Sequence, residues 1–165
     1  MRKIKLGVNI DHVATLRNAR NENFPNLLDV SEILKELQVD SITVHLREDR
    51  RHIKDDDVLA LKEKNYLPLN LEMAATREMK DFCLQVLPES CCIVPERREE
   101  LTTEGGLDVK NQTDYLGTFL PELLKKTKVS LFIDPDFDQI YASKELGVHA
   151  VELHTCLLYT SPSPR

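Results

Sequence analysis

The residues best suited to chemistry lie in one short stretch that directly follows the apolar run Ile42-Thr43-Val44. Positions 45–52 hold two histidines, three arginines and two carboxylates, in the order HLREDRRH. None of these side chains is buried cheaply without a partner, so the stretch predicts a loop at the end of a buried strand. Guanidinium groups bind phosphate, and histidine titrates near neutral pH. We therefore expect a site that holds an anion and moves protons.

The elements that must position this loop follow a regular alternation along the chain. Six apolar or β-branched runs are separated by stretches with helical spacing. The runs cover residues 6–11, 41–46, 67–72, 90–96, 128–134 and 149–155. Strands that alternate with helices in this way predict a parallel sheet covered by helices.

Five helices are expected between these strands, from apolar spacing and from N-terminal acids or caps. They are placed at 27–37, from 55, from 76, at 113–126, and from 136 to Gly147. The fourth is the weakest prediction, because Gly117 and Pro121 interrupt it.

Polar side chains at the strand ends distinguish between two architectures. An open doubly wound sheet places its ligand groups mainly at one switch point, whereas a (β/α)8 barrel gathers them in one ring. The residues at or near the carboxyl ends of the six runs are Asp11, His45, Glu72, Glu96, Asp134 and Glu152. The sequence has no glycine-rich phosphate loop of the dinucleotide or P-loop type. We therefore expect an α/β fold of the (β/α)8 TIM-barrel class, here an incomplete barrel of about six βα units.

Composition limits the class of partner. The chain of 165 residues suits one domain, and its net charge of −6 argues against nucleic acid. Arginines nevertheless cluster at 17 and 20, at 47, 50 and 51, and at 97 and 98, which favours small phosphorylated substrates. No run could span a bilayer, and the four cysteines lack metal-type spacing. We expect a cytoplasmic protein with reduced cysteines and no membrane partner.

Six ordered motifs resemble the pyridoxine 5′-phosphate synthase family. They are NIDHVATLRNAR at 9–20, TVHLREDRRH at 43–52, NLEM at 70–73, VPE at 94–96, TTEGGLD at 102–108 and SLFID at 130–134. Any one of them alone is weak, but together they form a specific match that covers residues 1–155.

The resemblance implies a barrel enzyme of vitamin B6 biosynthesis that uses no metal or organic cofactor and assembles as a homo-octamer. Family members condense 1-deoxy-D-xylulose 5-phosphate with 3-amino-2-oxopropyl phosphate, and release phosphate and water as the pyridine ring closes. His45 and Glu72 match general acid–base residues, and Glu152 matches a group that stabilises a transition state. The positions that match substrate contacts are Asp11, His12, Arg47, His52 and Thr102 for the deoxyxylulose phosphate, and Asn9 and Arg20 for the amino-ketone phosphate.

The residue types suit these roles, while simpler interpretations stay open. Glu72 ends the apolar run 67–71, where low polarity raises the pKa of a carboxyl group. Glu72 could instead form a salt bridge, and His45 could be a structural histidine that pairs with a neighbouring residue. Asp11 and His12 could cap the first strand, and Arg20 could lie on the surface.

A long charged segment follows the fourth strand. Residues 95–109 read as an irregular loop, in which Gly105 and Gly106 supply hinge conformations. Because closure against water favours a reaction that eliminates water, we expect this segment to act as a lid. A solvated charge run is the alternative.

The last residues depart from the family pattern. The sequence after Thr155 reads CLLYTSPSPR and resembles a translated DNA-library adaptor, where the family continues with two further βα units. We expect residues 1–155 to form a partial TIM-barrel domain and residues 156–165 to be a non-native tail. On this interpretation the 165-residue chain is inactive and prone to aggregate, because its edge strands lack partners.

Two other functions remain as alternatives. A metal-dependent barrel enzyme could use Asp11, His12, His45 and Glu72 as ligands, because histidines and carboxylates at strand ends form common metal sites. A non-catalytic fragment could keep the arginines and bind a phosphorylated ligand without turnover.

Overall fold

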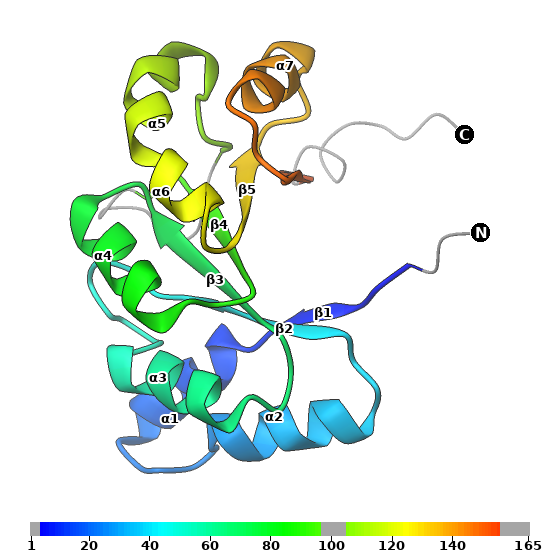
Figure 1. Ribbon diagram of the computed structural model, residues 1–165. Helices are drawn as coiled ribbons and strands as arrows, with labels where there is room; N and C mark the ends of the chain where they lie inside the picture. The colour runs from blue at the N-terminus through cyan, green and yellow to red at the C-terminus, as the bar shows by residue number, and fades with distance from the viewer. Residues whose placement is uncertain (1–3, 97–104, 156–165) are drawn as a thin grey trace, which may run out of the picture.

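The computed structural model describes residues 4–96 and 105–155, in which six strands alternate with helices (Figure 1). The strands are β1 (Gly7–Asn9), β2 (Ser41–His45), β3 (Leu69–Ala74), β4 (Ser90–Val94), β5 (Lys128–Ile133) and β6 (Ala150–Leu153). The helices are α1 (Asp11–Arg20), α2 (Leu27–Glu36), α3 (Asp55–Lys64), α4 (Arg77–Val86), α5 (Thr113–Phe119), α6 (Pro121–Leu124) and α7 (Phe137–Glu145), with a 3-10 turn, η1 (Lys110–Gln112).

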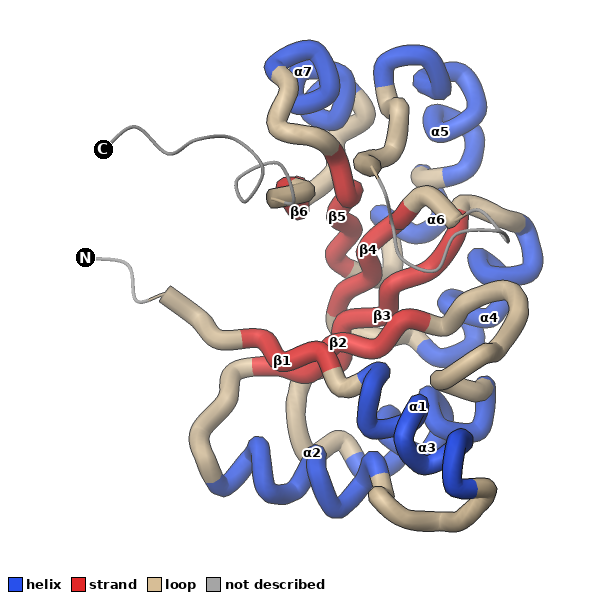
Figure 2. The backbone as a smooth tube through the Cα atoms, turned by 180° about the vertical axis from the view of Figure 1, so that it is seen from behind, coloured by secondary structure: helices blue, strands red, loops and turns tan. Residues whose placement is uncertain are grey.

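The strands form one parallel sheet in the order of the chain, β1-β2-β3-β4-β5-β6. The sheet curls into part of a barrel, and the helices cover its outer side (Figure 2). Because each crossover is a helix that returns the chain to the same end of the sheet, all strand carboxyl ends lie at one rim. This is the incomplete TIM-barrel fold that the sequence predicts.

Alternation along the strands separates the two faces of the sheet. In β3, Leu69, Leu71 and Met73 are buried, whereas Asn70 and Glu72 alternate with them. The parallel register places Glu72 beside His45 on one neighbour and beside Cys92 on the other. Apolar residues therefore pack beneath the helices, while a polar row lines the concave face.

Local signals in the sequence are confirmed at the helix ends. The side chains of Thr76 and Asp136 accept hydrogen bonds from the backbone N–H groups of Met79 and Asp138, so both are N-caps. Gly147 follows α7 with a φ of 73°, the left-handed conformation that suits glycine. The three acids at 55–57 occupy the first turn of α3.

Two expectations about the helices are wrong. The segment after β1 forms an additional helix, α1, which is not among the five that the sequence predicts; its weak amphipathicity hides it from a periodicity search. The single helix expected at 113–126 is two helices, α5 and α6. Pro121 occupies the first turn of α6, where its missing N–H is tolerated, whereas Gly117 lies within α5.

The two ends of the curled sheet are open in the part of the chain that the structure describes. β1 pairs with β2 alone and β6 with β5 alone, so each has one edge without a strand partner among residues 4–96 and 105–155. Within the same residues, no helix has the length and apolar character needed to cross a membrane. The lid expected at 95–109 lies mostly outside the described residues, which omit 97–104.

Candidate active site

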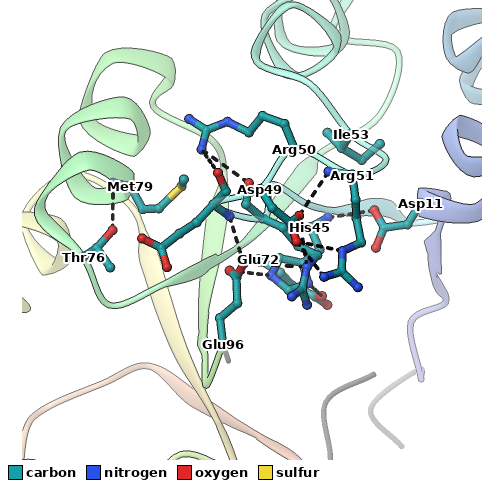
Figure 3. A network of polar contacts seen from close by, with 12 residues as sticks. Asp11, His45, Asp49, Arg50, Arg51, Ile53, Glu72, Thr76, Met79 and Glu96 are labelled. Atoms are coloured by element: carbon teal, nitrogen blue, oxygen red, sulfur yellow. Dashed lines mark hydrogen bonds and ion pairs between the residues drawn. The ribbon is translucent and has the colours of Figure 1, made fainter. Parts of the chain in front are cut away.

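His45 and Glu72 form the centre of the candidate site, at the rim where β2 and β3 end. Nδ1 of His45 lies 4.0 Å from Oε2 of Glu72, and both side chains are largely buried. The strand register makes the two residues direct neighbours. Figure 3 shows them among the surrounding polar side chains.

Asp11 holds the first strand to this centre. It begins α1 and is buried, and its Oδ1 accepts a hydrogen bond of 2.8 Å from the backbone N–H of His45. Oδ2 of Asp11 accepts a second hydrogen bond, from Asn9, and Oδ1 of Asn9 in turn accepts the Asp11 N–H. The pair therefore links the end of β1 to the end of β2.

The ionisation of Glu72 is strongly perturbed. Burial raises its pKa to about 7, the negative charge of Glu152 adds to the rise, and His45 opposes it. The carboxyl group therefore exchanges its proton near neutral pH, which suits a general acid or base. The rise expected from its position in an apolar run is confirmed, although the electrostatic contribution of Glu152 depends on the tertiary structure.

Glu96 is a member of the site to which the sequence analysis assigned no role. Its side chain is 1% exposed, with Oε2 at 3.5 Å from Nε2 of His45 and Oε1 at 3.6 Å from Nε of Arg47. Oε1 also accepts a hydrogen bond from the backbone N–H of Glu48. The signal in the sequence was the carboxylate placed two residues after the last residue of β4.

The three arginines of the 45–52 loop have different surroundings. Arg47 is 6% exposed and lies close to both Asp49 and Glu96. Arg50 binds Asp55 and Glu78, which attaches the loop to α3 and α4. Arg51 binds Asp49, and this contact is the main cause that holds the pKa of Asp49 at about 2. Arg47 is thus the arginine of this loop that points into the candidate site.

His52 and His12 lie on the α1 side of His45. The ring centroids of His52 and His45 are 6.1 Å apart. Burial lowers the pKa of His52. The nearby charges of His45, Arg47 and His12 lower this pKa further, whereas the negative charge of Asp11 raises it. His52 is therefore neutral at physiological pH, and its Nδ1 accepts the backbone N–H of Ile53.

The remaining predicted residues are placed differently. Glu152 on β6 is exposed, but it acts on the pKa of Glu72 and so faces the same interior. Arg20 is at the far end of α1, roughly 13 Å along the axis from Asp11, and pairs with Glu22 on the surface. Thr102 lies outside the described residues.

The site also contains a possible cation-binding set. Asp11, His45 and Glu72 each offer one ligand atom, and these atoms lie within 4.8 Å of one another. Three of the four ligands in the metal-dependent alternative are therefore close together. His12 is not a member of this set.

Comparison with known proteins assigns the family. The sequence profile described as "Pyridoxal phosphate biosynthesis protein PdxJ" matches residues 6–161. The chain belongs to this family. The PdxJ match runs through all six strands and continues six residues into the segment 156–165.

Curated relatives carry the same assignment. Pyridoxine 5′-phosphate synthase of Ehrlichia ruminantium strain Welgevonden is 55% identical over 156 residues, which are 94% of this chain and 66% of the relative. The synthase of Thioalkalivibrio sulfidiphilus is 52% identical over 98% of this chain and 65% of the relative. That of Coxiella burnetii strain RSA 493 is 52% identical over 92% of this chain and 64% of the relative. The chain thus spans slightly less than two thirds of these PdxJ proteins, all of which are named as enzymes.

Proposed function

We propose that the protein is a pyridoxine 5′-phosphate synthase, which condenses 1-deoxy-D-xylulose 5-phosphate with 3-amino-2-oxopropyl phosphate. Membership of the PdxJ family supports the reaction. The single structural observation that carries the proposal is the pair of His45 and Glu72, because a buried carboxyl group with a pKa of about 7 lies 4.0 Å from an imidazole.

Proton transfer is the chemistry that this pair supplies. Ring formation passes through a Schiff base and enols, so protons must be removed from and returned to carbon, nitrogen and oxygen. Glu72 exchanges its proton near neutral pH, and His45 serves as the second acid–base group. Glu152, which lies close enough to raise the pKa of Glu72, stabilises positive charge that develops on the substrate.

Substrate binding is assigned to the groups around this pair. Arg47, His52, Asp11, His12 and Thr102 contact the deoxyxylulose phosphate in this proposal, and Asn9 and Arg20 contact the amino-ketone phosphate. The buried guanidinium of Arg47 supports the first assignment, because a bidentate donor suits a phosphate. We further propose a cytoplasmic homo-octamer that uses no cofactor.

The chain of 165 residues is expected to be inactive by itself. In the described residues β1 and β6 each have an unpaired edge, and Glu152 is exposed where a closed barrel would cover it. A fragment of this kind could still bind a phosphorylated ligand through Arg47 without turnover.

The experiment compares this chain with a chimera, in which residues 1–155 are joined to the carboxyl-terminal third of the Ehrlichia ruminantium relative. We expect the chimera to form pyridoxine 5′-phosphate from both substrates, and the 165-residue chain to form none. Substrate binding by the chimera without product would favour the non-catalytic binder.

The metal-dependent alternative is tested in the same assay. It is favoured by one observation, the closeness of the ligand atoms of Asp11, His45 and Glu72. We expect activity of the chimera to persist in a chelator. Loss of activity that zinc or manganese restores would assign the three residues to a metal site instead.

A further inference from the structure

The carboxylate of Glu96 lies between the backbone N–H of Glu48 and the imidazole ring of His45. Its Oε1 accepts a hydrogen bond of 2.9 Å from the backbone N–H of Glu48, and its Oε2 faces Nε2 of His45 at 3.5 Å. The Glu96 side chain is almost fully buried, so water does not compete for Oε2. The contact with Glu48 fixes the carboxylate in place beside the imidazole.

Other groups face His45 from each neighbouring element. Glu72 on β3 faces Nδ1, Asp11 on α1 accepts the backbone N–H, and the neutral ring of His52 lies 6.1 Å away. Nε of Arg47, two residues after His45, lies 3.6 Å from Oε1 of Glu96. Glu96 is therefore the acidic group that faces Nε2 among residues 4–96 and 105–155.

Glu96 and Glu72 differ in charge at neutral pH. Burial raises the pKa of Glu96, but the contacts with His45, with the Glu48 N–H and with Arg47 outweigh it and hold the pKa below its ordinary value. By contrast, burial raises the pKa of Glu72 to about 7, so this carboxyl group titrates near neutral pH. An ionised carboxylate accepts hydrogen bonds and donates none, so a bare Nε2 lone pair would be repelled by Glu96.

We propose that Glu96 is a positioning residue that keeps the proton of neutral His45 on Nε2, which leaves Nδ1 as the nitrogen that exchanges protons beside Glu72. The placement of the proton rests on the contacts of Glu96. The use of Nδ1 in turnover rests on the proposed function. A carboxylate that sets the tautomer of a histidine in this manner is a common device in catalytic and metal sites.

The substitution Glu96→Gln is expected to move the proton of His45 from Nε2 to Nδ1. The Glu48 N–H requires an acceptor, so the amide oxygen of the glutamine turns toward Glu48 and its NH2 group turns toward His45. Nε2 then accepts a hydrogen bond, and the proton moves to Nδ1. The substitution changes neither the length nor the shape of the side chain.

The other histidines supply internal references. Nδ1 of His52 and Nδ1 of His149 accept backbone N–H groups at 2.9 and 3.1 Å, so both rings carry the proton on Nε2 when neutral. Nδ1 of His154 lies 3.0 Å from Oδ1 of Asp134, which favours the proton on Nδ1. Both tautomers are therefore expected in one protein.

The test is 15N NMR of the histidine-labelled 165-residue chain at a pH where the imidazoles are neutral. His45→Asn identifies the His45 signals. We expect the proton on Nε2 of His45 in the unsubstituted chain and on Nδ1 in Glu96→Gln, with no change in Glu122→Gln, a surface glutamate on α6. A proton on Nδ1 of His45 in the unsubstituted chain overturns the proposal, and this result does not depend on the folding of Glu96→Gln.

A kinetic measurement in the chimera gives an independent readout. We expect Glu96→Gln to lower kcat on the order of tenfold or more while KM stays within about twofold, because the substrate contacts are kept and the wrong nitrogen carries the proton. Equal kcat values in Glu96→Gln and the unsubstituted chimera would overturn the role in turnover. If the unsubstituted chimera makes no product, the proposed function fails, while the NMR result still decides the tautomer.

Discussion

Glu72 lies directly beside His45 in the register of β3 and β2, and Nδ1 of His45 is 4.0 Å from Oε2 of Glu72. This separation is longer than a hydrogen bond, so neither side chain is occupied by the other, and each can exchange a proton with a bound substrate. Because they are neighbours, both groups could reach the same part of a bound substrate.

Removing either proton-transfer group should lower turnover much more than binding. In the chimera we expect His45→Asn and Glu72→Gln each to reduce kcat on the order of 10²-fold or more, because shape is nearly kept while the titratable group is lost. Substrate affinity, measured by calorimetry, should change little. A kcat within threefold of the unsubstituted chimera would remove that residue from the proton-transfer steps.

The raised pKa of Glu72 should make stability depend on pH. The carboxyl group titrates near 4.5 when unfolded and near 7 when folded, so the folded state holds more protons between these values. Its contribution to the free energy of unfolding is therefore present below pH 4.5 and is lost as the pH rises through 7, by on the order of 3 kcal/mol.

Urea unfolding of the chain and of Glu72→Gln measures this effect. Glutamine does not titrate, so the variant should gain stability relative to the unsubstituted chain as the pH rises from 4.5 to 8. A stability difference that is constant over this range would contradict the raised pKa.

Arg47 should act mainly on binding. Its guanidinium is buried within the site, and the phosphate contact that we propose for it would form already in the ground state. We expect Arg47→Ala in the chimera to weaken binding of deoxyxylulose phosphate by on the order of tenfold or more, consistent with loss of a charged hydrogen bond. Arg77→Ala, at an arginine that is 94% exposed on α4, is the control. Equal affinities of the two variants would move Arg47 out of substrate contact.

Asp57 should be important for stability because it joins α1 to α3. Its carboxylate binds Arg17 through two hydrogen bonds of 2.6 and 2.9 Å and also accepts the backbone N–H of Lys54. We expect Asp57→Ala to lower the free energy of unfolding by about 2 kcal/mol, since it removes a half-buried ion pair and a helix cap. The exposed neighbour Asp56→Ala should cost less than about 1 kcal/mol. Equal losses would show that only the helix dipole is involved.

Gly106 should tolerate no side chain, whereas Gly105 should. A Cβ atom at Gly106 would lie 2.0 Å from the backbone nitrogen of Asp134, while one at Gly105 would meet nothing closer than 3.9 Å. The approach is close because Leu107 N–H donates to the carbonyl of Phe132 in β5. Gly106→Ala should therefore lose at least about 2 kcal/mol of stability, and Gly105→Ala less than about 0.5 kcal/mol, in thermal or urea unfolding. A small loss in Gly106→Ala would show that this segment separates easily from β5.

Several features of the protein follow from the sequence alone. Runs such as 41–46 and 128–134 identify the strands within one or two residues, because alternating apolar residues pack beneath helices. Caps such as Thr76 and Asp136 depend on their own turn of the chain, so they can be identified without a fold. The motifs likewise predict the family, since they combine residue types and order.

Other features, such as the contacts of Glu96 and the pKa of Glu72, depend on segments that are distant in the sequence and could be seen only in the tertiary structure. α1 was missed because its weak apolar periodicity gives little signal in the sequence. The role of Glu96 was missed because Glu48, His45 and Arg47 meet it only when β2 and β4 curl to one rim. The pKa of Glu72 likewise depends on burial and on the charge of Glu152, 80 positions away along the chain. Composition and spacing specify which groups are present, whereas the distances between groups on different strands exist only in the folded sheet.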